Sequence, residues 1–346
     1  MIAAPRTRPA LRIGSLELSS AVMIAPMVGI TDAPCRELAL ELGAGLVSTE
    51  MIASEAVVRS LDASLHLLDF PAGVGPVGAQ LVGRDPVVMA EAAQVCVARG
   101  AVTVDVNLGC PVRKVVGRGS GAALARDVPA TAAVLEAMVD AVAVPVTAKM
   151  RLGWDAQSIN APELARALAG VGVSAITVHG RTRCQGYAGD ADWQEIARVK
   201  EAVDIPVIGS GDVEDVRLID RRIRAGVVDG VVVARGMLGN FWLIRQASHL
   251  LATGEVLDDL DFAARMALCR RHLDMLIAHH GAQRALRIGR KYVAWTIKGC
   301  NGAARLRAMV QELDSLDMLE SIFALALAAG LGPQGWFHPV FTSGDG

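Results

Sequence analysis

The sequence predicts an α/β fold: a (β/α)8 TIM barrel followed by a small all-helical C-terminal domain. Up to about residue 250, short β-branched runs alternate with Ala/Leu-rich segments of ten to fifteen residues, which is typical of βαβ units. These runs give eight candidate strands, the number that a TIM barrel requires. From about Leu251 onward the alternation stops and apolar residues recur at helical spacing instead.

The candidate elements follow one another in chain order. We expect strands at residues 21–25, 46–50, 77–82, 102–107, 145–150, 175–179, 206–209 and 229–234. Helices are expected at residues 32–42, 85–98, 129–142, 162–168, 191–202 and 212–225, several of which begin with the Asp or Pro that helix starts favour. A doubly wound sheet is the alternative, but the residues after its first strand read APMVGITD instead of a Gly-rich phosphate turn.

The chain of 346 residues is long enough for a barrel of about 250 residues and a small partner domain. We expect a barrel domain at residues 1–250, a helical domain at 251–330 and a Gly/Pro-rich tail at 331–346. The most apolar uncharged stretch, residues 322–331, is too short for a membrane span, which needs ~20 residues. We therefore expect a cytoplasmic protein without membrane contact, and nothing implies an obligate protein partner. Six irregularly spaced cysteines predict neither a disulfide framework nor a metal site.

Positive charge gathers in the helical region. Residues 261–310 hold ten Lys/Arg and two acids, a local charge of +8, whereas the whole chain carries −2. This distribution favours a polyanionic partner at that segment, and a solvated helical face is the alternative. On one helix, the spacing of Arg284, Arg287, Lys291 and Lys298 would bring these four side chains to a common side, with Arg290 nearby. A phosphate backbone could follow that side.

Polar residues stand at the carboxyl ends of the candidate strands, where barrels carry their catalytic groups. They are Glu50, Gln80, residues 107–110, Lys149 with Arg151, His179 with Arg181, residues 210–212, and Arg235. After strands seven and eight, Gly-Ser-Gly-Asp (209–212) and Ala-Arg-Gly (234–236) combine small residues with a basic one. Barrels commonly bind a cofactor phosphate at these two positions, although either loop alone is also an ordinary βα turn.

Three of these residues suggest chemistry of their own. Cys110 stands on a turn held by Gly109 and Pro111, and its thiol could donate a proton, although a lone cysteine is also a common small core residue. Lys149 lies in an otherwise apolar strand, so its amine needs an anion such as the ring of a reduced flavin. His179 ends a strand and precedes a basic loop, which favours contact with a ligand over a satisfied core histidine.

At these residues the chain resembles the tRNA-dihydrouridine synthases, flavoenzymes that reduce selected uridines of tRNA. The matching stretches are APMVGITD (25–32), DVNLGCPVRKV (105–115), AKMRLGW (148–154), VHGRTRCQGYAGDADW (178–193), IPVIGSGDV (205–213) and VVARG (232–236). Together with the helical domain they cover nearly the whole chain. RALRIGRKYVAWTIKG (284–299) also resembles the B-type bacterial branch, whose substrate we take to be the D-loop uridine near position 17.

The resemblance implies an oxidoreductase that uses FMN, with NADPH or NADH as the reductant. FMN would be bound by Pro26, Met27, Val28, Gln80, Lys149, His179, Ser210, Gly211, Asp212, Ala234 and Arg235. Val28, Ser210 and Ala234 depart from the family's usual Ala, Asn and Gly, which puts their side-chain contacts in question. A hydride would pass from FMN N5 to C6 of the uracil while Cys110 protonates C5.

The tRNA would contact Asn107, Arg181, Arg284, Arg287, Arg290, Lys291 and Lys298, and the basic helical domain would hold its backbone. Two alternatives stay open at this point. One is a flavin-dependent reductase of free pyrimidines, of the dihydroorotate type, and the other is a non-catalytic RNA-binding regulator on an inactive barrel.

Overall fold

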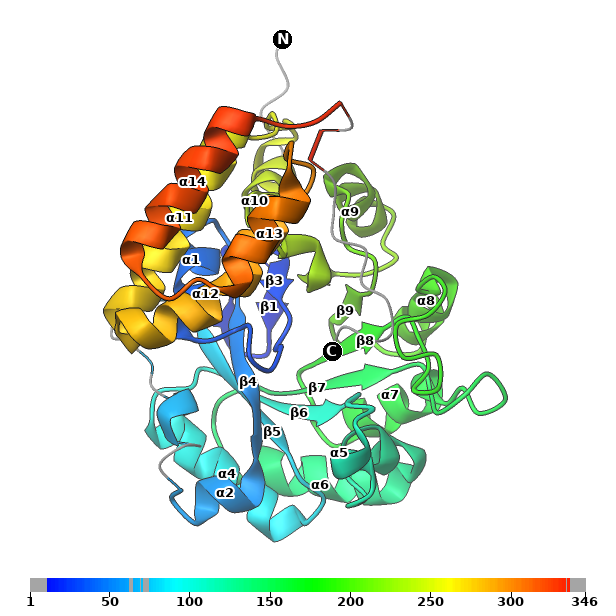
Figure 1. The fold of residues 1–346 in the computed structure, drawn as a ribbon. Coiled ribbons are helices and arrows are strands. Elements are labelled where there is room, and N and C mark those ends of the chain that lie inside the picture. Colours follow the sequence, from blue (N-terminus) through cyan, green and yellow to red (C-terminus); the bar gives the residue numbers. More distant parts are fainter. Residues whose placement is uncertain (1–10, 62–64, 69, 71–74, 334, 337–346) are drawn as a thin grey trace.

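The fold is described from a computed structural model, which covers residues 11–336 apart from 62–64, 69, 71–74 and 334. Most of the predicted tail lies outside the described residues. Eight parallel strands form the barrel (Figure 1): β3 (Val22–Ile24), β4 (Val47–Ala53), β5 (Val77–Val82), β6 (Val104–Leu108), β7 (Val146–Arg151), β8 (Ala175–His179), β9 (Val207–Ser210) and β10 (Gly230–Val233). A parallel bridge between Met23 and Leu46 joins β3 to the chain entering β4 and closes the ring. The predicted TIM barrel is therefore confirmed.

Helices surround the barrel and bury its outer face (Figure 1). In chain order they are α1 (Ala33–Glu41), α2 (Ser54–Val58), α4 (Pro86–Ala98), α5 (Arg113–Val116), α6 (Val128–Ala141), α7 (Ala161–Gly170), α8 (Trp193–Glu201), α9 (Val216–Arg224) and α10 (Trp242–Thr253), with short 3₁₀ turns η1 (His66–Leu68), η2 (Gly121–Arg126) and η3 (Arg235–Met237). The hairpin of β1 (Arg12–Ile13) and β2 (Leu16–Glu17) supplies Ile13 to the apolar core inside the barrel.

Aspartates set the starts of many helices. The carboxylate accepts hydrogen bonds from backbone N–H groups of the first turn at Asp32, Asp85, Asp127, Asp192, Asp215 and Asp261. Such caps satisfy donors that have no partner inside the helix. One prediction is wrong here: the helix expected from residue 212 begins at Val216, with Asp215 as its cap. Asp212 thereby stays available to the loop before it.

Four further helices form the helical region: α11 (Phe262–His280), α12 (Ala282–Thr296), α13 (Ala303–Gln311) and α14 (Leu316–Ala329). They lie together beside α1, in yellow to red in Figure 1. The helical nature of this region agrees with the prediction. However, α12 ends at Thr296, so Lys298 lies past the helix and the four cations do not share one helical side.

The helical region packs closely on the barrel. Tyr292 of α12 donates a hydrogen bond from Oη to the carbonyl of Ile30 (2.8 Å), and His280 Nε2 lies 3.1 Å from Asp32 Oδ2. Both partners belong to the loop that follows β3. Among the described residues, no helix combines the length and the apolarity that crossing a bilayer would require.

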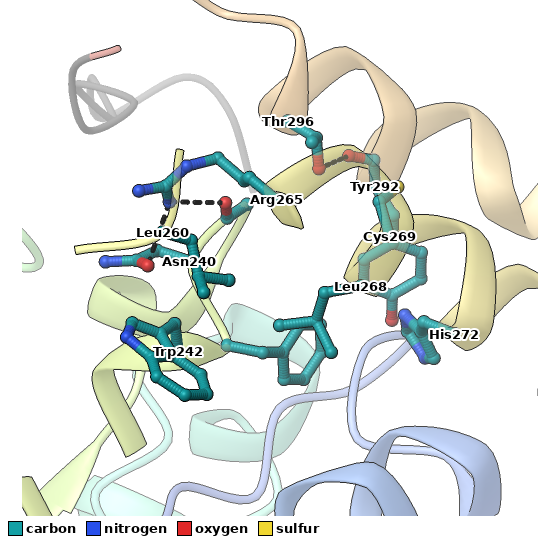
Figure 2. A pocket seen from close by; sticks show the side chains of 11 residues that line it. Asn240, Trp242, Leu260, Arg265, Leu268, Cys269, His272, Tyr292 and Thr296 are labelled. Atoms are coloured by element: carbon teal, nitrogen blue, oxygen red, sulfur yellow. Dashed lines mark hydrogen bonds between the residues drawn. The ribbon is translucent and has the colours of Figure 1, made fainter. Parts of the chain in front are cut away.

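A small pocket lies between α10, α11 and α12 (Figure 2). Arg265 spans one side of it and donates from Nη1 to Asn240 Oδ1 (2.9 Å). His272 is fully buried between the rings of Phe241 and Tyr292, at centroid distances of 5.0 and 4.4 Å. Within the described part of the chain neither ring nitrogen of His272 has a hydrogen-bond partner. Burial lowers the pKa of His272 to about 4, so the ring is neutral at pH 7.

Candidate active site

An open pocket lies at the carboxyl ends of β3, β7, β8, β9 and β10. It has about 580 Å³ of space, including the part open to solvent. The structure brings nine of the eleven predicted cofactor residues to its lining: Pro26, Met27, Lys149, His179, Ser210, Gly211, Asp212, Ala234 and Arg235. The other two are elsewhere, since the side chain of Val28 is 67% exposed and Gln80 is fully buried in the strand layer beneath.

Two glycines of the lining have no room for a side chain. A Cβ on Gly211 would stand 2.6 Å from Ala191 Cβ, and Gly211 has a φ of +110° that other residues rarely adopt. A Cβ on Gly236 would stand 2.3 Å from the carbonyl oxygen of Val213. Both glycines follow the ends of β9 and β10, where the sequence predicts a phosphate site. The packing of the surrounding loops therefore requires glycine at both positions.

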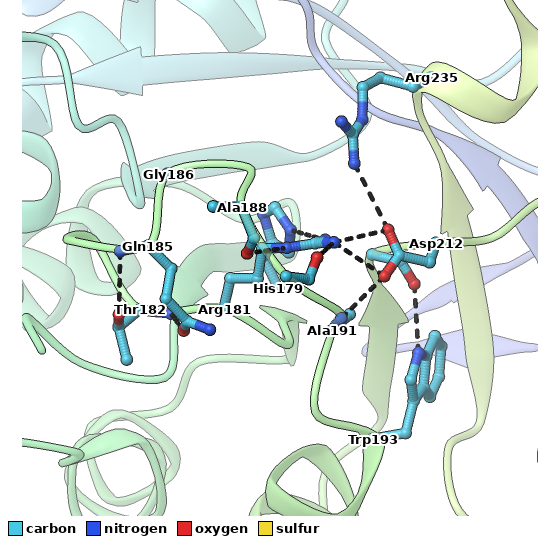
Figure 3. Close-up of polar contacts among 12 residues, drawn as sticks. His179, Arg181, Thr182, Gln185, Gly186, Ala188, Ala191, Trp193, Asp212 and Arg235 are labelled. Atoms are coloured by element: carbon cyan, nitrogen blue, oxygen red, sulfur yellow. Dashed lines mark hydrogen bonds and ion pairs between the residues drawn. The ribbon is translucent and has the colours of Figure 1, made fainter. Parts of the chain in front are cut away.

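Arg181 and Asp212 hold the loops around the pocket (Figure 3). Arg181 Nη2 lies 2.9 Å from each carboxylate oxygen of Asp212, and its Nε donates to the carbonyl of Ala188 at 3.3 Å. Asp212 Oδ2 also accepts from the backbone N–H of Ala191 at 2.7 Å. Arg181 is only 2% exposed. The guanidinium of Arg181 is thus buried and joins the loops after β8 and β9, and its contact with the substrate stays a prediction.

Burial shifts the pKa values of two basic residues of the pocket lining, Lys149 and His179. Burial lowers the pKa of Lys149 to about 8, with a further lowering from the charge of Arg151. Burial lowers the pKa of His179 well below its ordinary value, and the neighbouring cations act in the same direction. His179 is therefore neutral at pH 7, whereas Lys149 is still mostly charged. The pocket thus has a cation and a neutral imidazole at its floor.

Cys110 lies on a turn after β6, beside the pocket lining. The side-chain oxygen of Asn107 accepts hydrogen bonds from the backbone N–H of Cys110 (2.8 Å) and of Gly109 (3.2 Å). Asn107 is paired in register with Lys149 on β7. The thiol is half-buried. The turn thus brings the predicted proton donor and one predicted substrate residue next to the strand that carries Lys149.

Sequence reasoning missed two roles at this site. Arg151 ties the Cys110 turn to the loop after β8, because it donates to the carbonyls of Gly109 (3.0 Å) and Gly186 (2.8 Å). Tyr187 lines the pocket, and the guanidinium of Arg235 lies 4.8 Å from its ring centroid. The sequence feature that could have indicated Tyr187 is its position in a glycine-flanked loop, since the chain has only two tyrosines.

The predicted cations of the helical region differ in their surroundings. Arg284 and Arg287 are exposed on α12. Arg290 donates to the carbonyl of Leu313 through Nε (3.1 Å) and Nη2 (2.8 Å). Lys291 donates to the carbonyl of Gly29, and burial lowers its pKa. Arg290 and Lys291 therefore hold parts of the fold together, whereas Arg284 and Arg287 are the two predicted cations of α12 that face solvent.

The amino-acid sequence matches one protein family over most of its length. The family described as "Dihydrouridine synthase (Dus)" matches residues 23–326. A probable tRNA-dihydrouridine synthase of Rickettsia conorii is 41% identical over 90% of this chain and 95% of its own. tRNA-dihydrouridine synthase B of Xanthomonas axonopodis pv. citri is 38% identical over 93% and 98%.

Solved structures share the fold at low sequence identity. Histamine dehydrogenase from Rhizobium sp. 4-9 has a TM-score of 0.56 at 14% identity, over 77% of this chain and 50% of its own. The old yellow enzyme homologue from Zymomonas mobilis has a TM-score of 0.50 at 13% identity, over 74% and 95%. At such identities the likeness concerns the barrel alone.

Proposed function

Because the chain belongs to the dihydrouridine synthase family, we propose that it reduces the C5–C6 double bond of a D-loop uridine in tRNA, with FMN as cofactor and NADPH or NADH as reductant. The observation that carries this proposal is the pocket with Lys149 at its floor and the Cys110 turn beside it. We further propose uridine 17 as the target, on the likeness of residues 284–299 to the B-type branch and on relatives of that name at 38% identity.

The residues of the pocket fit FMN in their chemistry. Gly211 and Gly236 belong to the pocket lining and add no side chain to it, and Arg235 adds a positive charge for a phosphate. Lys149 supplies a cation for the electron-rich ring. We assign the phosphate to the loops after β9 and β10, and the ring to Lys149 and His179. Contacts from Val28 and Gln80 stay predictions.

The bound flavin would supply the hydride that the uracil receives at C6. The chain itself supplies the proton: the S–H bond of Cys110 breaks, the proton goes to C5, and solvent returns a proton to the thiolate. Lys149 holds positive charge at the floor of the pocket, and Asn107 holds the backbone of Cys110 at its side. Hydride and proton together account for the two hydrogens that dihydrouridine gains.

The surface around the Cys110 turn supports an RNA substrate. Residues 110–126 include four exposed cations and no acid: Arg113, Lys114, Arg118 and Arg126. In the helical region, α12 presents Arg284 and Arg287 to solvent. Phosphate contacts of this kind position a nucleic acid on a protein. A reductase of free pyrimidines would leave both surfaces without a role, so tRNA is the partner that we propose. In this proposal the barrel (1–250) is the catalytic domain and residues 251–330 form the tRNA-binding domain. The reaction would take place in the cytoplasm.

The test is a reconstitution with purified protein. We expect a yellow protein with an FMN spectrum that NADPH bleaches, and dihydrouridine in an unmodified tRNA transcript after incubation with NADPH. Sequencing the product and tRNA from a deletion strain identifies the position reduced. Dihydrouridine absent from the transcript, together with turnover of free uracil or dihydroorotate, would replace this proposal by the free-pyrimidine reductase. A colourless protein that binds tRNA would favour the regulator.

A further inference from the structure

A buried carboxylate lies two residues before the Asn107 that holds the Cys110 turn. Asp105 of β6 is 8% exposed and stands in register between Gln80 of β5 and Thr147 of β7. Both neighbours donate to it: Gln80 Nε2 to Oδ2 at 2.7 Å and Thr147 Oγ1 to Oδ1 at 2.7 Å. Burial raises the pKa of Asp105, while these hydrogen bonds and the charge of Lys149 act in the opposite direction. Burying a carboxylate is costly, so its place in the barrel calls for a role besides folding.

An unbroken series of hydrogen bonds joins this carboxylate to the Cys110 turn. Gln80 Nε2 donates to Asp105, and Gln80 Oε1 accepts from Asn107 Nδ2 at 2.8 Å. Asn107 Oδ1 in turn accepts from the backbone N–H of Cys110 at 2.8 Å. Gln80 is fully buried, so water does not compete for its amide.

Only one orientation of the Gln80 and Asn107 side-chain amides gives every donor in this series an acceptor. A backbone N–H can only donate, so Asn107 must turn its oxygen to the Cys110 turn and its NH₂ to Gln80. Gln80 must then present its oxygen to Asn107 and its NH₂ to residue 105. An ionised carboxylate can only accept, so Asp105 enforces this orientation from the opposite end.

We propose that Asp105 is a positioning residue for the proton donor: by fixing the orientation of the Gln80 and Asn107 amides, it holds the backbone of the Cys110 turn beside the pocket. This inference rests on the proposed function for its catalytic meaning. The effect of Asp105 on how firmly the Cys110 turn is held does not depend on any substrate.

The first variant is Asp105→Asn. An amide at 105 can donate as well as accept, so it no longer excludes the reversed orientation of Gln80. In that orientation Asn107 faces the turn with its NH₂ and loses its hydrogen bonds to the N–H groups of Gly109 and Cys110. We expect hydrogen exchange in a peptide covering residues 106–112 to quicken by roughly tenfold, as for the loss of one hydrogen bond. We expect the kcat for dihydrouridine formation to fall ~10-fold to 100-fold, less than removal of the acid itself would cost. The KM for tRNA and the rate of FMN bleaching by NADPH should stay within about twofold, although the variant also removes a negative charge near Lys149.

The decisive variant is the double change Asp105→Asn with Gln80→Glu. Asn at 105 still accepts from Thr147 and now donates to Glu at 80, whose second oxygen accepts from Asn107 Nδ2. The direction of the series and its single negative charge are both restored. We expect exchange in the 106–112 peptide to return to within about threefold of the original protein. Exchange is the readout for this variant, because Gln80 is also a predicted FMN contact and its replacement can change kcat independently. Thr147→Val is the matched control, because it removes the other hydrogen bond to Asp105 and leaves the direction unchanged.

Two outcomes would overturn the inference. In one, Asp105→Asn leaves exchange of the turn unchanged. In the other, the double variant stays as impaired as the single one, or Thr147→Val impairs the turn equally, which would mean that Asp105 serves packing alone. Melting temperatures of all three variants identify any that fail to fold. If the original protein makes no dihydrouridine, the proposed function fails, while the exchange measurements still decide the role of Asp105.

Discussion

Cys110 and Lys149 occupy different positions within one site. The thiol stands half-buried on a turn that basic side chains surround, whereas the amine lies at the pocket floor, where burial lowers its pKa to about 8. The thiol is positioned to meet a substrate, and the amine to meet a cofactor. Their replacement should therefore affect different halves of the reaction.

Replacing Cys110 with Ala should separate these halves. We expect the variant to keep FMN and to be bleached by NADPH at the original rate, because the thiol acts only on the uracil. Dihydrouridine formation should fall by roughly 10² to 10⁴, the usual worth of a general acid. Cys184→Ala is the control, since that cysteine is exposed in the loop after β8. Normal turnover of unmodified tRNA by the Cys110 variant would end the proton-donor role.

Lys149→Met should act on the cofactor and on stability. Removing the cation should weaken FMN retention or slow its reduction, as measured by flavin content and bleaching rate. In the flavin-free protein, the folded-state pKa of Lys149 is about 8 against 10.5 ordinarily, so the unfolded chain binds more protons between these values. The free energy of unfolding should therefore rise from pH 8 to about 10.5 through this group, and the variant should lack that rise. If the variant and the original protein have the same pH dependence of unfolding and the same flavin content, Lys149 does not contact the cofactor.

At the scale of elements, the loop after β3 links the site to the helical region. It supplies Pro26 and Met27 to the pocket. Farther along, Gly29 donates its N–H to Glu50 Oε2 (3.0 Å), and Lys291 of α12 donates to the carbonyl of Gly29. The helical region thus contacts the loop whose first residues line the pocket.

The junction of α10, α11 and α12 should be sensitive to acid through His272. Its folded-state pKa is about 4 against 6.5 ordinarily, so the unfolded chain binds more protons between these values. Stability should fall as the pH drops from 6.5 to 4, by up to about 3 kcal/mol for this group. We expect His272→Leu to flatten that part of the profile in denaturant unfolding, with pH 7 as the reference point. An equally steep acid profile in the variant would show that His272 is protonated and accommodated in the folded protein.

At the scale of the whole molecule, we propose that exposed cations in two regions contact the same tRNA. The segment after Cys110 belongs to the barrel and the exposed arginines of α12 belong to the helical region. A folded RNA is large enough to contact both while one base enters between them. This arrangement predicts that affinity and chemistry can be separated by mutation.

Replacing Arg284 and Arg287 with Ser should weaken tRNA binding without affecting the flavin. We expect a higher KM for tRNA, unchanged oxidation of NADPH, and a salt dependence of binding that is flatter by about 0.7 to 0.9 per lost phosphate contact. The matched control replaces Arg166 of α7 and Arg245 of α10, which are also exposed. An unaltered salt slope in a stable double variant would exclude α12 from the RNA contact, and a lower melting temperature with normal binding would assign the two arginines to the fold.

The sequence by itself determined the barrel and most of the pocket lining. Parallel strands all end at the same side of a barrel, so residues that follow β-branched runs meet there whatever their distance in the chain. That is why Lys149, His179, Ser210 and Arg235 could be predicted to line one site. Glycines after the last two strands predicted tight loops as well, because such turns depend on the local backbone alone.

Only the tertiary structure decided which polar groups are bound to one another. Arg181 and Asp212 pair across two loops, Lys291 reaches the carbonyl of Gly29 from another part of the chain, and Asp105 is linked to Cys110 through Gln80 on a neighbouring strand. Such pairings depend on strand register and on how helices dock, which residue type and spacing do not encode. The sequence therefore does not distinguish a charged side chain that faces RNA, as we propose for Arg284, from one that lies buried in the fold, as Arg181 does.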